Sequence, residues 1–589
     1  MMHRSLRFTP TILVLAACTP ASTVPSAVSP SATSAARSST TALQLAAFPD
    51  GWANKRRRPP VVAEHAMVVT NSELASAAGA EILKKGGNAV DAAVAVGFAL
   101  EVTFPFAGNI GGGGFMLIRM SDGTVAAIDY REVAPLAATR DMYVENGQLT
   151  RKSLVGALAS GVPGSVAGMS EALRKYGTMS LHDVMQPAIR LATDGFTIDS
   201  ALNRSLTGSA HLITQFAGAK IFFPNGSPLA AGTLLKQPEL ARTLGLIADQ
   251  GATAFYDGPI ADQIVAEMRR DGGIITREDL KSYTPVWRAP ITGTYRGYTL
   301  YTMPPSSSGG ITMLEVLNQL ETWPTLPAFN SAAYKHMLAE TFRRAFIDRN
   351  EKLGDPAFVR VPQEQLTDKT YAKQLASTIE PDRATPSPTF SGAREPMHTT
   401  HYSVVDAHGN AVSTTTTLNG GYGSGTFVDG AGFFLNNEMD DFAAQPGKPN
   451  QFGLIQGEAN AIQPGKRMLS AMSPTIVLDR GGKLLLVVGA AGGPTIITGV
   501  TQVILNVIDQ HMSLADAMYA PRMHQQAWPD SLTYEAGGFT QSAADSLVAM
   551  GYGLRKIGGL TNVNAVMRAP DGDLIGVVEP RSTGGAVGY

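Results

Sequence analysis

The stretch "TTHYSVVDAHGNAVSTTTTLNGG", residues 399–421, has the pattern of a single β-hairpin. Residues 399–406 and 410–418 are rich in Thr, Val, Tyr and Ser, which are residues typical of strands. Between them lies "AHG", a three-residue loop whose Gly409 can adopt the left-handed conformation that such hairpins need. The stretch therefore predicts two antiparallel strands joined by a short turn.

Hydroxyl groups gather at both far ends of this hairpin, because its six threonines fall in the groups 399–400 and 414–417. If Asp406 faces Asn410, Thr399 lies opposite Thr417, with Cβ atoms roughly 4.5–5.5 Å apart. We therefore expect the two hydroxyls to be close enough to form a hydrogen bond. Any single threonine in a strand is better explained by its fit to a pleated surface, so the pairing needs further support.

Upstream of the hairpin, "SELASAAGAEILKKGGNAVDAAVAVGFALEV" (residues 72–102) predicts two consecutive helices. Ser72 suits the N-cap of the first helix, and Gly86-Gly87 suits its end. Asn88 suits the N-cap of the second helix, with Asp91 in its first turn. The folded part of the chain therefore begins with packed helices soon after residue 61.

The next segment, "GGGGFMLIRMSDGTVAAIDYRE" (residues 111–132), predicts a strand, a turn at Asp122-Gly123 and a second strand that ends at Arg131. Its four glycines lack the spacing and the Lys-Ser/Thr pair of a phosphate-binding loop. Close approach of backbones explains them better. Helical patterns then alternate with Pro/Gly loops from about 180 to 390, and strands dominate again after 399. Two strand-rich regions separated by helices indicate an α/β sandwich in which distant segments pair.

Composition limits the classes of function. The chain has 589 residues and a formal net charge of −2, without long runs of one sign. Such a charge gives no electrostatic reason to expect a nucleic-acid partner. The histidines show no metal-ligand spacing and there is a single cysteine, so we expect neither a metal nor another cofactor.

The N-terminus has the form of an export signal, with Arg4 and Arg7 before a short apolar run. "LAAC", residues 15–18, resembles a bacterial lipobox, so we expect residues 1–18 to be a lipoprotein signal and Cys18 to carry a lipid. Thr19 rather than Asp follows Cys18, which favours anchoring of the protein in the outer membrane, facing the periplasm. The alternative is ordinary signal cleavage nearby. Residues 19–60, rich in Ser, Thr, Ala and Pro, predict a disordered tether.

Several ordered motifs carry a resemblance that covers roughly residues 61–589. "GGNAVDAAVA", "GGGGFM", "DYREVAP" and "VPGSVAG" resemble the large subunit of γ-glutamyltransferases, also called γ-glutamyl transpeptidases. "TTHYSVVDAHGNAV", "LNNEMDDF", "PGKRMLSAMSPTIV" and "GAAGGPTIIT" resemble the small subunit. The resemblance implies an αββα sandwich of the N-terminal-nucleophile (Ntn) hydrolase type. It also implies a precursor that cuts itself between His398 and Thr399, giving subunits 61–398 and 399–589.

For the chemistry, the resemblance places the nucleophile at Thr399. A threonine hydroxyl is a weak nucleophile, but a free α-amine on the same residue, with a reference pKa of about 7.7–8.0, can act as its base. Thr417 would orient the Thr399 hydroxyl. The family's oxyanion glycines match Gly492 and Gly493, and Pro494 suits the first position of the helix that follows.

For the substrate, the resemblance assigns residues to each of the two charged groups of a γ-glutamyl substrate, its α-carboxylate and its α-ammonium. Arg131 matches the family's carboxylate-binding arginine, and Ser470 matches one of two adjacent serines. The second of these is Ala471, which removes a hydroxyl from the carboxylate site. Side chains that match the family's contacts to the ammonium group are Asn419, Glu438 and Asp441. Residues 446–460 resemble a lid loop, with Phe452 where a tyrosine is often found.

The function expected is transfer of γ-glutamyl groups from glutathione and similar compounds to water, amino acids or dipeptides. An alternative of the same fold is an acylase that removes glutaryl groups, as cephalosporin acylases do, and that needs no ammonium pocket. A solute-binding lipoprotein would share the tether and the size. A serine hydrolase with a Gly-x-Ser-x-Gly elbow is disfavoured because that pattern is absent.

Overall fold

The predicted hairpin is present in the computed structural model, which describes residues 48–55, 59–387 and 399–589. Its strands are β12 (Thr400–Val405) and β13 (Ala411–Thr417). They pair with Thr400 opposite Thr416, the register that the sequence predicted. Gly409 has a φ of +84°, the left-handed conformation expected of the loop.

The hairpin lies in the middle of a seven-stranded antiparallel sheet, which we call the hairpin sheet. On one side β12 pairs with a strand from the start of the folded chain, and on the other β13 pairs with the glycine-rich strand. The distant segments therefore pair as predicted. In order the strands are β23 (Gly585–Gly588), β2 (Met67–Thr70), β12, β13, β3 (Gly113–Arg119), β4 (Val125–Tyr130) and β9 (Val286–Arg288).

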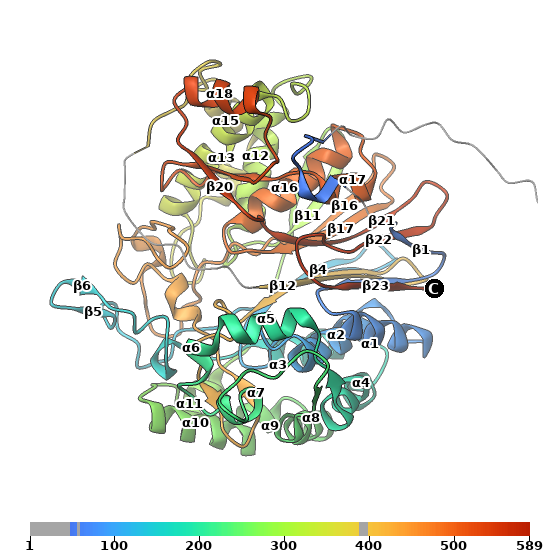
Figure 1. Ribbon diagram of the computed structural model, residues 1–589, viewed down its shortest axis with the longest axis vertical. Coiled ribbons are helices and arrows are strands. Elements are labelled where there is room, and N and C mark those ends of the chain that lie inside the picture. Colours follow the sequence, from blue (N-terminus) through green and yellow to red (C-terminus); the bar gives the residue numbers. More distant parts are fainter. Residues whose placement is uncertain (1–47, 56–58, 388–398) are drawn as a thin grey trace, which may run out of the picture. The chain divides into compact units, whose positions relative to one another are not determined.

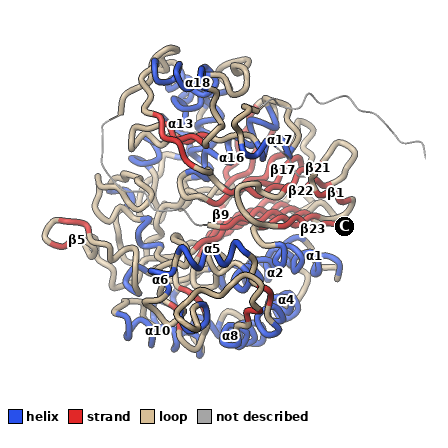
Figure 2. The backbone as a smooth tube through the Cα atoms, viewed as in Figure 1, coloured by secondary structure: helices blue, strands red, loops and turns tan. Residues whose placement is uncertain are grey.

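A second seven-stranded antiparallel sheet packs face to face on the hairpin sheet, so that β12 contacts β17 and β21. Buried apolar side chains from both sheets fill the space between them. Figure 2 shows the two stacked sheets with helices on either side. In order the strands of the second sheet are β1 (Val61–Ala63), β22 (Leu574–Val577), β21 (Asn562–Arg568), β17 (Leu484–Ala491), β16 (Thr475–Leu478), β11 (Tyr298–Thr302) and β10 (Ile291–Tyr295).

Helices cover the outer faces of both sheets, which gives the expected αββα arrangement (Figure 1). The group on the hairpin-sheet side comprises α1 (Glu73–Lys84), α2 (Ala89–Thr103), α3 (Ser165–Tyr176), α4 (Leu181–Asp194), α5 (Ser200–Gly208), α6 (Ala210–Ile213), α7 (Ala219–Phe222), α8 (Pro238–Gln250), α9 (Thr253–Tyr256), α10 (Pro259–Asp271) and α11 (Arg277–Ser282). The group on the second side comprises α12 (Gly309–Leu320), α13 (Ala332–Lys352), α14 (Gln363–Leu366), α15 (Lys369–Ala376), α16 (Thr495–Ile508), α17 (Leu514–Tyr519) and α18 (Gln541–Ala549). Among the helices of the described residues, none has the length and apolarity needed to cross a membrane.

Short elements complete the structure and border the functional region. Within the described residues, the 3-10 helices are η1 (Ala53–Lys55), η2 (Ala157–Ala159), η3 (Glu438–Asp441) and η4 (Glu458–Asn460). A small three-stranded sheet contains β18 (Met523–His524), β19 (Leu532–Glu535) and β20 (Leu554–Ile557). Three two-stranded pairs are β5 (Val144–Glu145) with β6 (Gln148–Leu149), β7 (Phe196–Thr197) with β8 (Leu234–Leu235), and β14 (Phe427–Val428) with β15 (Phe433–Phe434).

The helix caps predicted from the sequence are confirmed. The Ser72 hydroxyl accepts a hydrogen bond from the backbone N–H of Ala75, and Asn88 forms a capping box with Asp91. One boundary differs slightly, because α16 begins at Thr495 and Pro494 occupies its N-cap rather than its first position. Pro494 nevertheless has helical angles, so the fixed φ of proline still prepares the start of the helix.

The glycine run before β3 lets backbones approach closely, as predicted. A Cβ atom at Gly112 would lie 2.1 Å from the carbonyl oxygen of Thr417, and one at Gly114 would lie 2.5 Å from that of Thr415. The loop before this run is held by buried Glu101, whose carboxylate accepts a hydrogen bond of 2.7 Å from the N–H of Ile110. Burial raises the pKa of Glu101 from 4.5 to about 8, although this hydrogen bond lowers it.

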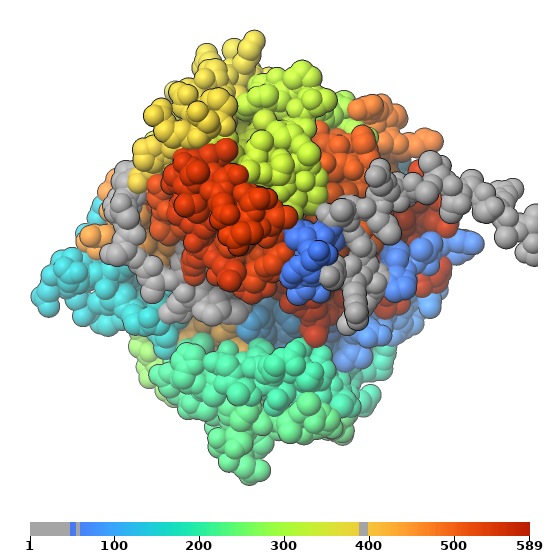
Figure 3. Space-filling model, turned by 45° about the horizontal axis from the view of Figure 1, so that its top comes forward, coloured from blue at the N-terminus to red at the C-terminus, as the bar shows by residue number. Residues whose placement is uncertain are grey.

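The structure corrects the prediction of a disordered tether for its last part. Residues 48–55 pack on the body of the protein, and Trp52 is only 2% exposed. Its indole N–H donates a hydrogen bond of 2.9 Å to the carbonyl oxygen of Tyr519. Figure 3 shows this segment in blue beside residues near the C-terminus. One large aromatic side chain buries enough apolar surface to anchor a segment that is otherwise poor in core-forming residues.

Replacing Glu101 by Gln should stabilise the protein progressively as the pH rises from about 5 to about 8. An acid with a raised pKa in the folded state binds its proton more tightly there than in the unfolded state. Its contribution to stability is therefore complete below pH 4.5 and is lost as the pH rises through about 8. The Gln oxygen can still accept the hydrogen bond from Ile110. Calorimetric Tm values at several pH values would measure the change, with exposed Glu64→Gln as the control. A Tm difference between Glu101→Gln and wild type that is independent of pH would contradict this assignment.

Candidate active site

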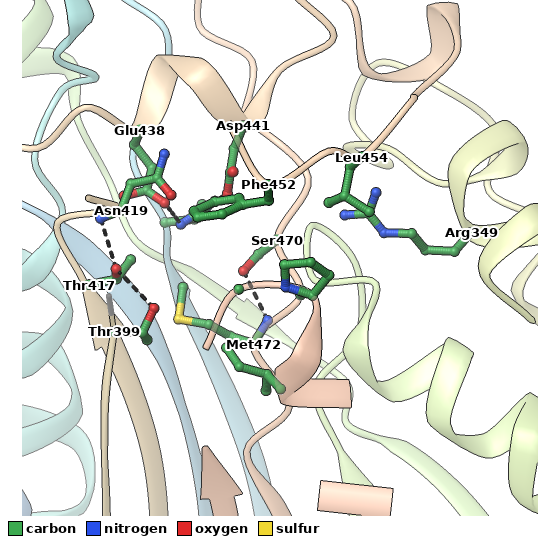
Figure 4. Close-up of a pocket in the computed structure, with 15 residues that line it drawn as sticks. Arg349, Thr399, Thr417, Asn419, Glu438, Asp441, Phe452, Leu454, Ser470 and Met472 are labelled. Atoms are coloured by element: carbon green, nitrogen blue, oxygen red, sulfur yellow. Dashed lines mark hydrogen bonds and ion pairs between the residues drawn. The ribbon is translucent and has the colours of Figure 1, made fainter. Parts of the chain in front are cut away.

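A narrow pocket lies where the end of the hairpin meets the turn between β17 and α16, and it brings together most of the predicted site residues (Figure 4). Its free volume is about 20 Å³, room for little more than one water molecule. The residues that line it are Arg131, Arg349, Thr399, Thr417, Asn419, Glu438, Asp441, Phe452, Leu454, Ser470, Ala471, Met472, Gly493, Pro494 and Ile496. His398 and Cys18 lie outside the described residues.

The two threonines at the end of the hairpin face each other in this pocket. The Oγ1 atoms of Thr399 and Thr417 are 3.3 Å apart, within hydrogen-bonding distance. Thr417 Oγ1 also accepts a hydrogen bond of 2.8 Å from the backbone N–H of Asn419. Figure 4 shows the three residues joined in a row. Both threonine side chains are buried, so the hairpin register places two hydroxyls together away from bulk water.

Asn109, which the sequence analysis did not identify, holds the end of β13 through hydrogen bonds to Thr416 and Thr417. Its Nδ2 donates hydrogen bonds to Thr416 Oγ1 at 3.0 Å and to the carbonyl oxygen of Thr417 at 2.9 Å. Its Oδ1 accepts a hydrogen bond of 2.6 Å from the Ser165 hydroxyl. An asparagine just before a glycine run is the only local signal for this role. These contacts hold Thr417 at the position where its hydroxyl meets Thr399.

Arg131 forms ion pairs with both Glu438 and Asp441. The arginine was expected to face one end of a ligand and the two acids the other end. In the structure the guanidinium pairs with both acids, because all three side chains are buried in one narrow pocket and unpaired charges would be costly there. Burial lowers the pKa of Arg131, but Glu438 and Asp441 outweigh that effect and keep its pKa above the ordinary value.

A third acid, Glu132, also lies at Arg131, with its Oε2 atom 3.7 Å from the guanidinium. It follows Arg131 directly in the sequence but was not identified there. Neither of its carboxylate oxygens has a hydrogen-bond partner among the described residues. Burial raises its pKa to about 7, and burial likewise raises the pKa of Glu438 well above its ordinary value, although Arg131 opposes both shifts. The cluster therefore favours binding of a proton or another positive group.

The remaining predicted residues border the same pocket. Ser470 accepts a hydrogen bond of 3.1 Å from the N–H of Met472, and Ala471 presents its methyl group beside it. Asn419 donates from its side chain to the carbonyl oxygen of Asn437 at 3.0 Å. The pocket wall beside Thr399 therefore has one hydroxyl group at positions 470–471.

The glycine pair forms the tight turn from β17 into α16. Gly492 and Gly493 have φ values of +142° and +55°, which side-chain-bearing residues rarely adopt. Gly493 lines the pocket that contains Thr399, whereas Gly492 lines a larger pocket next to it. The turn therefore borders both spaces, at the start of a helix whose first N–H groups give it a partial positive charge.

The loop of residues 446–460, predicted to be a lid, contributes Phe452 and Leu454 to the pocket wall. It is held by residues that the sequence analysis missed. Arg349, from α13, donates a hydrogen bond of 2.9 Å to Gln456 of this loop. Gln456 and Asn460 in turn donate to the carbonyl oxygen of Asp441 at 3.1 and 2.7 Å. Phe452 is 4% exposed and lines the pocket. No local pattern marks Arg349, because its contacts join segments about 100 residues apart.

Comparisons with known proteins give one consistent family. The family model described as Gamma-glutamyltranspeptidase matches residues 75–589. The Glutathione hydrolase proenzyme of Escherichia coli (strain K12) is 48% identical over 532 residues, which cover 89% of this chain and 91% of the relative. The Acylase ACY 1 proenzyme of Pseudomonas sp. (strain SE83) is 38% identical over 542 residues, 90% and 94% of the two chains. The crystal structure of cephalosporin acylase from Bacillus halodurans matches with a TM-score of 0.81 and 28% identity, over 92% of this chain and 99% of that one.

Proposed function

The chain belongs to the gamma-glutamyltranspeptidase family, with the Ntn-hydrolase fold, and we propose that it is a self-processing γ-glutamyltransferase and glutathione hydrolase. The higher identity to a glutathione hydrolase than to an acylase supports this choice. Membership of an enzyme family also sets aside the solute-binding alternative. The donors are glutathione and other γ-glutamyl compounds, and the acceptors are water, amino acids or dipeptides.

Thr399 is the proposed nucleophile. Cleavage after His398 turns its amide nitrogen into a free α-amine, which can take the hydroxyl proton near neutral pH. The Thr399 oxygen then attacks the γ-carbonyl carbon. The amide bond breaks, the protonated α-amine gives its proton to the nitrogen of the leaving amine, and the γ-glutamyl group remains as an ester on Thr399. The hydrogen bond of 3.3 Å to Thr417 supports an orienting role for that hydroxyl. Water or an amine then takes the acyl group in the second half of the reaction.

The observation that carries the substrate assignment is the ion-paired cluster of Arg131, Glu438 and Asp441 beside Thr399. The α-carboxylate of a γ-glutamyl group can replace an acid on Arg131, while its α-ammonium pairs with the acids that are released. Such an exchange leaves every buried charge with a partner. A glutaryl group brings only the carboxylate, so it would release an acid without compensating it.

Binding requires the lid to move, because the pocket has too little free volume for a γ-glutamyl group. Phe452 and Leu454 line the pocket from the lid and would shift as the substrate enters. Gly492 and Gly493 are the proposed oxyanion donors, at the positive end of α16. Ala471 leaves Ser470 as the hydroxyl beside the α-carboxylate, which increases the share of recognition that falls on the ammonium contacts.

Export and lipidation at Cys18 remain part of the proposal and rest on the sequence pattern alone. A lipid there would anchor the protein in the outer membrane, facing the periplasm. The large subunit would then carry the anchor. The small subunit would be held by the hairpin, whose strands pair on both sides with strands of the large subunit.

Self-cleavage should yield a C-terminal fragment of residues 399–589, 191 residues that begin with Thr399. Thr399→Ala should remain one chain because it lacks the hydroxyl that attacks the preceding peptide bond. Intact-mass analysis of both purified proteins measures this directly. Recovery of an uncut but fully active wild-type chain would refute the mechanism.

Thr417→Val should slow catalysis by roughly 10²-fold or more while the fold is kept, because the orienting hydroxyl is lost. Thr416→Val is the matched control on the opposite face of β13. Its hydroxyl donates to the carbonyl oxygen of Gly113, so its loss should lower stability more than rate. The measurements are kcat per mole of processed enzyme with a γ-glutamyl anilide, and Tm. Equal losses of rate in the two variants would argue against the pairing of Thr399 with Thr417.

Asp441→Asn should lower kcat/KM for γ-glutamyl substrates by about 10- to 150-fold, the value of one charge-assisted hydrogen bond of about 1.5–3 kcal/mol. Glutaryl substrates lack the ammonium group, so they should lose little or gain. Parallel assays with γ-glutamyl and glutaryl anilides measure the change in selectivity. If both substrates lose equally, or if the wild type already prefers glutaryl, the acylase alternative is the better one.

A further inference from the structure

A second, larger pocket opens beside the catalytic pocket, and we call it the outer chamber. Its free volume is about 510 Å³, far more than that of the catalytic pocket. Phe452 lines both spaces, and the turn of residues 492–495 borders both. The other lining residues are Ala491, Gln526, Thr533, Arg555, Ile557, Gly559, Leu560, Thr561, Asn562 and Arg581. The chamber therefore lies next to the catalytic pocket, and both the glycine turn and Phe452 border the two spaces.

The chamber contains one arginine without a counter-charge. Arg555 lies on β20, is exposed, and forms no ion pair within the described part of the chain. Because side chains alternate along a strand, Arg555 and Ile557 face the chamber while the intervening Lys556 does not line it. Arg555 thus places a positive charge at this space, and Lys556 provides the same type of charge one residue away on the other face.

The other arginine of the chamber is already neutralised. The side chain of Arg581 is only 5% exposed and donates to Glu535 at 2.7 Å and to Glu579 at 3.0 Å. Two carboxylates therefore hold it, and a ligand would have to displace them to reach it. A carboxylate that enters the chamber would instead meet Arg555, whose charge no described acid balances.

The chamber also has polar groups that suit a peptide-like ligand. Thr533 is 2% exposed, lines the chamber, and its Oγ1 has no hydrogen-bond partner among the described residues. Gln526 donates a hydrogen bond of 3.3 Å to the carbonyl oxygen of Phe452. This hydrogen bond joins the wall of the chamber to Phe452, which lines both spaces. A buried unpaired hydroxyl is costly unless a ligand or water satisfies it.

We propose that the outer chamber binds the amine side of the reaction, with the terminal carboxylate of an amino acid or short peptide paired to Arg555. This inference rests on the proposed function. The amine that leaves during acylation and the amine that enters during transfer must occupy the same place, because the second reaction is the reverse of the first. The chamber therefore holds the leaving dipeptide of glutathione and then the acceptor.

In the transfer step, the acceptor nitrogen forms a bond to the γ-carbonyl carbon of the ester on Thr399. The bond from that carbon to Thr399 Oγ1 breaks, and the proton released by the amine ends on this oxygen. Arg555 touches none of the reacting atoms. It is a specificity residue that binds the far end of the acceptor.

The test compares Arg555→Ala with the matched control Lys556→Ala. Two donors are used: glutathione, whose leaving group carries a carboxylate, and γ-glutamyl-p-nitroanilide, whose leaving group carries none. Two acceptors are used with the anilide donor, glycylglycine and glycylglycine amide. Arg555→Ala should lower kcat/KM for glutathione relative to the anilide by about two- to fivefold, the upper part of the range for one solvent-exposed charge pair. The KM for glycylglycine should rise by about the same factor, and that for its amide should change little.

Lys556→Ala should leave two ratios as in the wild type: kcat/KM for glutathione relative to the anilide, and KM for glycylglycine relative to its amide. Equal behaviour of the two variants, or an equal loss for glycylglycine and its amide in Arg555→Ala, would overturn the assignment. If Arg555→Ala changes only kcat/KM for glutathione, or only the KM for glycylglycine, the leaving group and the acceptor do not share this subsite. Turnover of the anilide by the wild type tests the proposed function separately. If the wild type does not turn over the anilide, the proposed function fails before any variant is compared.

Discussion

The contact on which the active site depends is the pairing of Thr399 with Thr417 across the end of one hairpin. The antiparallel register fixes it, and a slip of one residue would turn Thr417 to the opposite face. The register cannot slip easily, because β12 also pairs with β2 and β13 with β3. Gly112 and Gly114 are part of the same constraint, since side chains there would collide with the carbonyl oxygens of β13.

Charge balance imposes the second constraint. Arg131 lies among three buried carboxyl groups, two of which pair with it directly. Such a cluster is stable only while its charges compensate one another. In the proposed exchange, a ligand with both a carboxylate and an ammonium leaves every charge with a partner, whereas a ligand with a carboxylate alone leaves a released acid without one. The loop of residues 446–460 supports this arrangement, because its Gln456 and Asn460 side chains hold the backbone of Asp441.

Local patterns predicted the parts of the fold that local chemistry decides. The hairpin register followed from a strand pattern around Gly409, and the helix starts followed from Ser72 and Asn88. The candidate site residues came from a family resemblance instead, and the structure brings most of them into one pocket. The direct pairing of Arg131 with Glu438 could not be predicted, because it joins residues more than 300 positions apart and depends on how closely two loops approach. The burial of Trp52 was missed for the same reason.

The central claim is that Thr399 carries the γ-glutamyl group, and rapid quenching tests it most directly. The processed enzyme is mixed with a γ-glutamyl donor, quenched in acid within one turnover, and digested for peptide mass mapping. The account predicts that the added mass of a γ-glutamyl group appears on the peptide that begins at Thr399, and that hydroxylamine removes it as it removes esters. A covalent adduct on any other residue, or turnover without an adduct under conditions where acylation outpaces deacylation, would contradict it.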